Sequence, residues 1–346
     1  MPNDALTLAN TATGQAPSRA SVWPGLLLAG GIALVAWQLG RWLPLVGGPV
    51  FGIVLGVIMA NALRVPALCQ PGIRFAGKQV LQWSIVALGL GLSLTQVART
   101  GLNSLAVTGV TVTAAFVTAW LLGRVLGIPS KLKLLIGVGT AICGGSAIAA
   151  VTPIVRAEEH ETAFAISTIF LFNLIAVLVF PLLGHLMGMS DQGFGLWAGT
   201  AINDTSSVVA AGYSYSSAAG DFATIVKLTR ATLIIPVCLG LALIEAWRNK
   251  RQGGGDFKLS RVFPWFIAWF VVASAVRTAG WIPADWHTGI HFLAEFLIIV
   301  ALAAIGLSSN LKRMAATGFR PIALGLGVWI AVALSSLAVQ MVMGQL

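Results

Sequence analysis

Long apolar stretches separated by short polar segments follow one another along this chain, and they restrict what it can fold into. A helix needs about 20 mostly apolar residues to cross a bilayer. Only 9% of the 346 residues are charged, against about a quarter in a water-soluble domain. The sequence therefore predicts an all-α polytopic membrane protein with about eleven transmembrane helices, near residues 22–43, 47–64, 77–97, 102–126, 133–156, 162–187, 193–216, 220–246, 262–280, 287–308 and 320–344.

Two polar segments lie outside these stretches. Residues 1–20 contain one basic residue, Arg19, and lack the basic start and short apolar centre of a cleaved signal peptide. We expect them to form a disordered cytoplasmic tail. The rest, residues 21–346, is expected to form a single transmembrane transporter domain with a cytoplasmic loop at residues 247–261.

The basic residues between the predicted spans indicate the orientation of the chain, because cytoplasmic loops carry an excess of Lys and Arg. With eleven spans, fifteen basic residues fall on one side, and the other side has four, Arg41, Arg99, Arg156 and Arg277. We therefore expect a multi-pass protein of the bacterial inner membrane, with a cytoplasmic amino terminus and a periplasmic carboxyl terminus. Because the basic residues are scattered between apolar blocks, the net charge of +10 does not indicate nucleic-acid binding.

Two internal similarities indicate repeats. Ile-Val-Ala-Leu followed by Gly-Leu-Ser occurs at 85–93 and 299–308, in spans that run in opposite directions, as in an inverted repeat. Gly-Thr-Ala-Ile occurs at 139–142 and 199–202. The second pair would run in parallel in the eleven-span topology. Either one of those segments is re-entrant, or the similarity is local.

Small polar residues follow both copies of Gly-Thr-Ala-Ile, in the middle of apolar segments. Consecutive glycines break a helix, and irregular backbone at this depth is tolerated only inside protein or beside a cavity. We predict two discontinuous helices whose free N–H groups face a bound anion; close packing of small residues is the alternative. The candidate substrate-binding residues are Cys143, Gly144, Gly145, Ser146, Asn203, Asp204, Thr205 and Ser206.

Asp204, Lys227 and Arg230 fall deep inside the predicted spans, where charges are costly and usually functional. Asp204 is a candidate ion-coupling residue, although it could also cap the half-helix that follows. Lys227 and Arg230 share a helix face and are candidate ligands of an anionic substrate. The alternative is that Arg230 pairs with Asp204 and holds two helices together.

Glu295 is a second candidate for ion coupling, unless its segment begins later than expected and leaves it near the surface. His287 and His291 share its face and are expected at the outer interface rather than at a metal site. The acidic run from Glu158 to Glu161 is expected in an outer, solvated loop, because it lacks the HExxH spacing of a zinc protease.

No catalytic constellation or nucleotide-binding motif is present in the sequence. The three cysteines, Cys69, Cys143 and Cys238, have neither zinc-ligand nor disulfide spacing. We therefore expect a protein that is not an enzyme and has no cofactor and no metal.

Three segments carry a resemblance to a known family. They are 131–153 with Leu-Ile-Gly-Val-Gly-Thr-Ala-Ile-Cys-Gly-Gly-Ser-Ala-Ile, 199–213 with Gly-Thr-Ala-Ile-Asn-Asp-Thr-Ser-Ser-Val, and 226–236 with Val-Lys-Leu-Thr-Arg. The chain resembles the YeiH family of bacterial inner-membrane proteins, also named a sulfate exporter family. The resemblance implies inverted repeats and crossed, broken helices, as in the bile-acid, arsenite and auxin-type carriers with which the family is grouped.

The leading hypothesis is a secondary transporter, an exporter of sulfate, sulfite or a small sulfonate. Protons, sodium ions or the gradient of the anion itself would drive it, and the chain could form a homodimer. A carrier of a carboxylate or a cation on the same fold, and a passive anion channel, are the alternatives.

The first prediction concerns the two termini. Alkaline phosphatase, which is active only outside the cytoplasm, should be active when fused after Leu346, because the basic residues place the carboxyl terminus in the periplasm. A fluorescent green fluorescent protein fusion at the same position would contradict this orientation.

Overall fold

The structure is a computed structural model that describes residues 21–43, 46–63, 65–248, 265–312 and 318–345. Within these residues all regular elements are helices, which confirms the predicted all-α polytopic fold. The predicted tail (1–20) and most of the predicted loop 247–261 lie outside the described residues. In the described part of the chain, six stretches are long and apolar enough to cross a membrane, namely Trp23–Trp42, Leu94–Val125, Glu159–Leu186, Ser217–Glu245, His287–Ser308 and Phe319–Met343.

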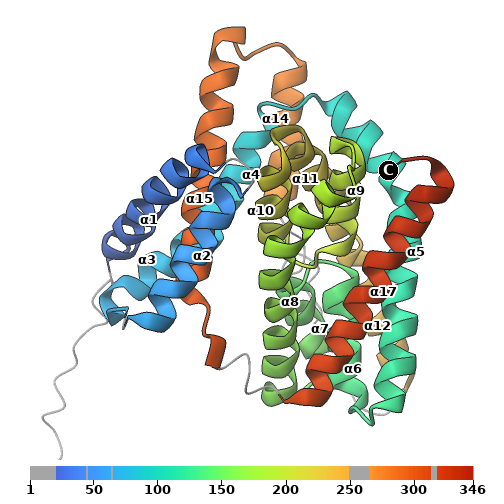
Figure 1. The fold of residues 1–346 in the computed structure, drawn as a ribbon. Coiled ribbons are helices and arrows are strands. Elements are labelled where there is room, and N and C mark those ends of the chain that lie inside the picture. Colours follow the sequence, from blue (N-terminus) through green and yellow to red (C-terminus); the bar gives the residue numbers. More distant parts are fainter. Residues whose placement is uncertain (1–20, 44–45, 64, 249–264, 313–317, 346) are drawn as a thin grey trace, which may run out of the picture.

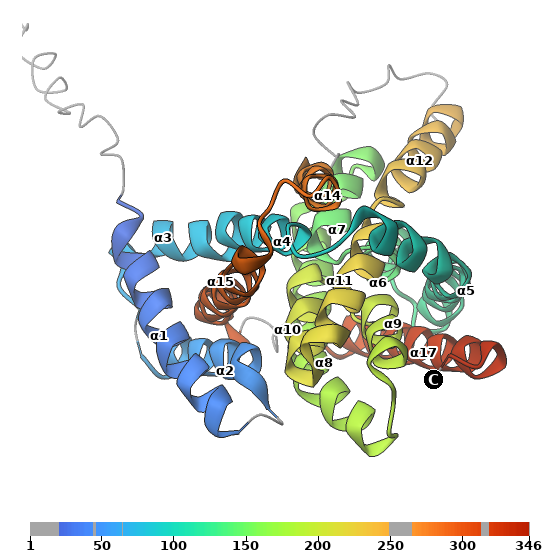
Figure 2. The same cartoon turned by 90° about the horizontal axis from the view of Figure 1, so that it is seen from above.

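The helices form two groups that lie side by side (Figures 1 and 2). The small bundle contains α1 (Trp23–Trp42), α2 (Gly47–Ala62), α3 (Gln70–Phe75) and α15 (His287–Ser308). The large bundle contains α5 (Leu94–Val125), α6 (Ser130–Ala141), α7 (Gly145–Val155), α8 (Glu159–Leu186), α9 (Asp191–Ala201), α10 (Thr205–Tyr215), α11 (Ser217–Ala231), α12 (Ile234–Arg248) and α17 (Phe319–Met343).

Two further helices, α4 (Leu81–Gly89) and α14 (Trp265–Thr278), lie between the bundles (Figure 2). A π-helical turn, Ala76–Val80, joins α3 to α4, and the short 3₁₀ helices Ala67–Cys69 and Ala284–Trp286 precede α3 and α15. The two bundles also touch through an apolar cluster of α2, α4, α8, α10 and α15, made of Val50, Ile53, Val57, Leu88, Val177, Val209, Ala210, Ala294, Ile298 and Leu302.

Glycines let α2 and α15 approach closely inside the small bundle. A Cβ atom on Gly56 would lie 2.4 Å from the carbonyl oxygen of Ala303 and 3.0 Å from Gly306 Cα. Small residues of this kind bring membrane helices into backbone contact. The small bundle therefore has a tightly packed centre beside its larger neighbour.

We call the end of the molecule where α1 and α6 begin the lower end, and the end where α8 meets α9 the upper end, as drawn in Figure 1. α1 climbs from the lower to the upper end, and α17 reaches the upper end at the carboxyl terminus. The described parts of the two terminal regions therefore lie at opposite ends, as the predicted orientation requires.

Two of the eleven predicted spans turn back inside the molecule and return to the end they started from. The Lys131 ammonium donates to the carbonyl oxygen of Arg156 at 2.8 Å, which places both ends of the α6–α7 pair at the lower end. The Ser216 hydroxyl donates to Asp191 Oδ1 at 2.6 Å, which places both ends of α9–α10 at the upper end. We call these pairs the lower hairpin and the upper hairpin.

The hairpins explain two differences from the predicted topology. The acidic run Glu158 to Glu161 lies on the same side of the molecule as Lys131. Its predicted placement in an outer loop, on the side opposite Lys131, was therefore wrong. The run forms a capping box for α8, in which the Glu161 carboxylate accepts from the Glu158 N–H at 2.9 Å. With Arg156 on this side, sixteen basic residues lie on the expected cytoplasmic side and three on the other. The expected orientation therefore does not change.

The second internal similarity also becomes consistent with an inverted repeat. α6 enters from the lower end and α9 from the upper end (Figure 1), so the two Gly-Thr-Ala-Ile segments run in opposite directions rather than in parallel. These half-helices have 12 and 11 residues, about 16–18 Å. Each therefore reaches about halfway through a 30 Å hydrocarbon layer.

Cysteine accessibility tests the hairpins. Cysteines placed at the exposed positions Lys131 and Glu159 should react with a membrane-impermeant maleimide from the same side, whereas one at the exposed Gln192 should react from the opposite side. Labelling of Lys131→Cys and Glu159→Cys from opposite sides would mean that α6–α7 crosses the membrane.

Candidate functional site

The helix break in the lower hairpin contains a backbone position that favours glycine. α6 ends at Ala141, and α7 begins at Gly145. Gly144 has φ +68°, a conformation that glycine adopts without steric cost. Its N–H donates to the Gly139 carbonyl oxygen at 2.9 Å, which closes the end of α6.

The upper hairpin breaks at Asn203 and Asp204, between α9 and α10. Asp204 adopts an extended conformation and caps α10, because its Oδ2 accepts from the Ser206 N–H at 3.0 Å. The Ser206 hydroxyl donates to the same oxygen, and Thr205, the first residue of α10, is buried. The capping role considered for Asp204 is therefore confirmed.

The tips of the two hairpins meet inside the large bundle. A Cβ atom on Gly144 would lie 3.4 Å from Asp204 Cβ. Asn173 of α8 binds beside this contact, where its Oδ1 accepts from the Asp204 N–H at 3.2 Å. The prediction that both helices are interrupted is confirmed, and the structure also brings the two breaks into contact. The role of Asn173 was missed, although a lone Asn in the apolar α8 was a signal that could have found it.

Lys227 of α11 links the two tips. Its side chain has 0% exposure, and its ammonium donates to the carbonyl oxygens of Ile142 at 2.8 Å and of Ile202 at 2.9 Å. One acceptor belongs to the lower hairpin and the other to the upper hairpin. Lys227 therefore joins the places where the two half-helices end.

Arg230, one helical turn further along α11, makes a second link of the same kind. Its Nε and Nη2 atoms donate to the carbonyl oxygens of Ala141 at 2.7 Å and of Thr140 at 2.6 Å in the lower hairpin. Its Nη1 donates to the Thr200 carbonyl in the upper hairpin. Arg230 therefore binds carbonyl groups rather than forming the ion pair with Asp204 that the sequence analysis gave as an alternative.

The two cations bind the carboxyl ends of α6 and α9, where helix carbonyls lack partners and the helix dipole is negative. The amino ends of α7 and α10 face the same region with their positive ends. Asp204 caps α10, but no side chain caps α7. Two cations, one carboxylate and one uncapped amino end together favour an anion at the tips.

Several polar groups at the tips are available to a ligand. Asn203 is 1% exposed, and neither its Oδ1 nor its Nδ2 has a hydrogen-bond partner among the described residues. The Nδ2 of Asn173 also has none. Cys143 is a buried free thiol, whereas Ser146 is exposed and Asp204 half-buried. Buried polar groups are usually paired, so Asn203 is a candidate ligand of a molecule bound at the tips.

Glu295 does not belong to this group. It lies on α15 in the small bundle, where its Oε1 accepts from the Ser217 hydroxyl at 3.0 Å and lies 3.5 Å from His291 Nδ1. The structure thus brings together the two hairpin breaks, Lys227 and Arg230, and places the other predicted ion-coupling residue elsewhere.

Replacing the Arg230 guanidinium tests its structural role. Arg230→Gln should lower the free energy of unfolding in detergent by about 3–5 kcal/mol, because it removes a buried charge and leaves buried carbonyl groups unpaired. Thermal unfolding of the purified variant measures this loss, and Arg99→Gln, at an exposed position of α5, is the control.

The double variant Arg230→Gln with Asp204→Asn should be no more stable than Arg230→Gln, since the guanidinium binds carbonyls rather than that carboxylate. Recovery of wild-type stability in the double variant would instead support the ion pair.

Comparisons with known proteins place the chain in a family. The family model described as "Conserved hypothetical protein 698" matches residues 24–325. A UPF0324 membrane protein of Fusobacterium nucleatum is 42% identical over 340 residues, which cover 92% of this chain and 98% of that protein. One from Streptococcus pyogenes is 43% identical over 332 residues, 93% of this chain and 97% of the relative. The chain belongs to the UPF0324 family of membrane proteins.

Proposed function

We propose that this protein is a secondary transporter that exports a small sulfur oxyanion, such as sulfate, sulfite or a small sulfonate, across the bacterial inner membrane. The observation that carries the proposal is the uncapped amino end of α7 beside two buried cations and the unpartnered amide of Asn203. This combination offers hydrogen-bond donors and positive charge to one small anion.

In the proposed site, the first N–H groups of α7 and the Asn203 amide bind the oxyanion directly. Lys227 and Arg230 act from behind the tips. They donate to carbonyl groups of both hairpins, and their charges also attract an anion in a low-dielectric interior. Cys143, Gly144, Gly145 and Ser146 form the lower wall of the site, and Asn203 to Ser206 form the upper wall.

The arrangement favours a carrier over a channel. The two hairpins enter from opposite ends and meet halfway, so a solute at the tips is separated from each side by a different hairpin. Discontinuous helices in opposed repeats, with half-helix ends pointing at a substrate, are typical of secondary transporters. The resemblance to the YeiH family, and through it to bile-acid, arsenite and auxin-type carriers, supports the same proposal.

Asp204 is the proposed coupling residue at this site. It is half-buried and lies beside the anion site, where its carboxylate could exchange a proton or hold a sodium ion as the anion binds or leaves. A carboxylate inside a membrane protein typically has such a function. Its capping bond to α10 would connect its charge to the position of the upper tip.

Counterflow in proteoliposomes tests the substrate class. Vesicles loaded with unlabelled sulfate should accumulate radiolabelled sulfate, and external sulfite or thiosulfate should compete. Competition by citrate alone would favour a carboxylate carrier. Steady conductance in a planar bilayer without saturable counterflow would favour a channel.

The variant Asn203→Leu tests the site itself. It removes two buried polar atoms that have no partner among the described residues, so thermal stability should be unchanged or higher, while sulfate counterflow should fall at least tenfold. Thr108→Val is the matched control, because Thr108 Oγ1 on α5 is also buried and without a partner but lies outside the hairpins. Equal counterflow by the two variants would exclude Asn203 from the site.

A further inference from the structure

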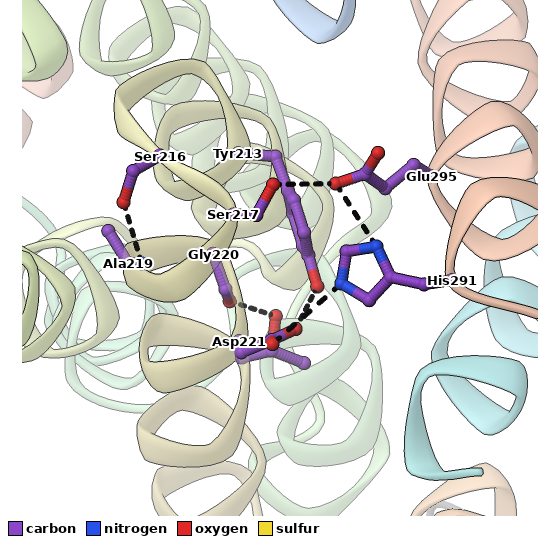
Figure 3. Close-up of polar contacts among 9 residues, drawn as sticks. Tyr213, Ser216, Ser217, Ala219, Gly220, Asp221, His291 and Glu295 are labelled. Carbon is purple, nitrogen blue, oxygen red and sulfur yellow. Dashed lines mark hydrogen bonds and ion pairs between the residues drawn. The ribbon is translucent and has the colours of Figure 1, made fainter. Parts of the chain in front are cut away.

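A second group of charged side chains lies at the upper end, where α11 of the large bundle faces α15 of the small bundle. Figure 3 shows His291 reaching from α15 between two carboxylates, Asp221 of α11 and Glu295 of its own helix. The imidazole Nε2 lies 3.8 Å from Asp221 Oδ2, and Nδ1 lies 3.5 Å from Glu295 Oε1. One imidazole thus bridges acidic groups on the two bundles.

Hydroxyl groups hold both carboxylates in place. The Tyr213 hydroxyl of α10 donates to Asp221 Oδ1, and the Ser217 hydroxyl of α11 donates to Glu295 Oε1 at 3.0 Å. The Ser217 bond also joins the two bundles, because Glu295 belongs to α15. The carboxylates are therefore fixed on either side of the imidazole (Figure 3).

The link through His291 depends on its charge. At 3.5 and 3.8 Å the contacts exceed ordinary hydrogen-bond lengths, so attraction is strong only when the imidazole is protonated. Without that proton, Asp221 and Glu295 face each other as two negative charges on different bundles. Histidine is the side chain whose charge ordinarily changes between about pH 5 and 8.

Water can reach this group from the upper end. A cavity of about 220 Å³ touches Glu295, Ser217 and Tyr213, and its other walls include Trp37 and Arg41 of α1. The cluster is partly exposed as well, with side-chain exposures of 32% for His291, 20% for Asp221 and 34% for Glu295. A proton from the solution on this side therefore has a path to the imidazole.

The other charged groups near His291 are few. The Arg41 guanidinium stacks on Trp37 at 5.1 Å and lines the cavity, and α2 and α4 carry no titratable side chain. Helix α3, which carries Arg74, lies towards the lower end (Figure 1). Among the described residues, Asp221, Glu295 and Tyr213 contact the imidazole, and Arg41 lines the cavity beside Glu295. His287 is the first residue of α15, and Asp285 lies in the 3₁₀ helix that precedes it.

We propose that Asp221, His291 and Glu295 form a proton-binding site that holds the upper ends of the two bundles together. Among the described residues, no cluster of His, Cys, Asp and Glu could hold a metal ion, and the ligand of this site is the proton. Protonated His291 attracts both carboxylates and keeps the upper end closed. Loss of the proton leaves the carboxylates to repel one another, and the bundles separate at this end.

Spin-label distances between the bundles test the proposal without any transported solute, so the result does not depend on the proposed anion site. Labels are attached at Trp42→Cys, at the upper end of α1, and Leu186→Cys, at the upper end of α8, in full-length protein whose three native cysteines are replaced by alanine. Both positions are exposed, at 69% and 83%. Distances are measured in nanodiscs at about pH 5.5 and about pH 8.5, on either side of the ordinary histidine range.

We expect a single short distance at the acidic pH and an additional longer one at the alkaline pH. His291→Gln should show the longer distance at both pH values, and the double variant Asp221→Asn with Glu295→Gln should show the short one at both. His160→Gln is the control, because His160 lies near the beginning of α8, where it contacts Glu158 at 3.2 Å. This variant should keep the wild-type response.

An unchanged pH response in His291→Gln, or distances in the unsubstituted background that do not depend on pH, would overturn the proposal. Asp221→Asn alone provides a second measurement if His291→Gln does not fold. It removes one of the two carboxylates and should reduce the pH response by at least half, and a full response in this variant would also count against the proposal.

Discussion

The site depends on two buried cations that bind the free carbonyl ends of two half-helices. A helix that ends inside a membrane protein leaves carbonyl groups unpaired and places about half a negative charge at its carboxyl end. Lys227 and Arg230 donate hydrogen bonds to these carbonyl groups of α6 and α9 and place positive charge beside the negative helix ends. Without them the two hairpins would bring four helix ends together with their negative ends unpaired.

This arrangement connects the packing of the large bundle with its proposed function. Because the cations take up the carboxyl ends, the amino ends of α7 and α10 determine which ligand fits the tips. Asp204 caps α10, and α7 has no side-chain cap. The unpartnered Asn203 amide lies in the same break. These features support the proposed binding of a small anion at the tips, and the proposed proton site around His291 would act separately, on the contact between the bundles at the upper end.

The sequence predicted the helices and the two breaks, and it left open whether one of the two broken segments is re-entrant; the structure shows that both turn back. A segment of about 24 apolar residues is long enough for one span or for two half-helices, and length alone does not separate them. The signal was Lys131 and Arg156 at both ends of one segment, which suits a hairpin with both ends in the cytoplasm. Depth in the membrane drew attention to Lys227 and Arg230, and the structure places both at the hairpin tips. Their carbonyl partners could not be predicted, because the sequence does not show which carbonyl groups are left unpaired at helix ends in the folded protein.

Direct localisation of a bound anion tests the central claim, that the hairpin tips hold a small oxyanion. Selenate has the shape and charge of sulfate and gives anomalous X-ray scattering. Crystals soaked in selenate should show an anomalous peak within hydrogen-bond distance of the first N–H groups of α7 and of the Asn203 side chain. Tight selenate binding in solution together with a peak elsewhere in the molecule, and none at the tips, would contradict the account.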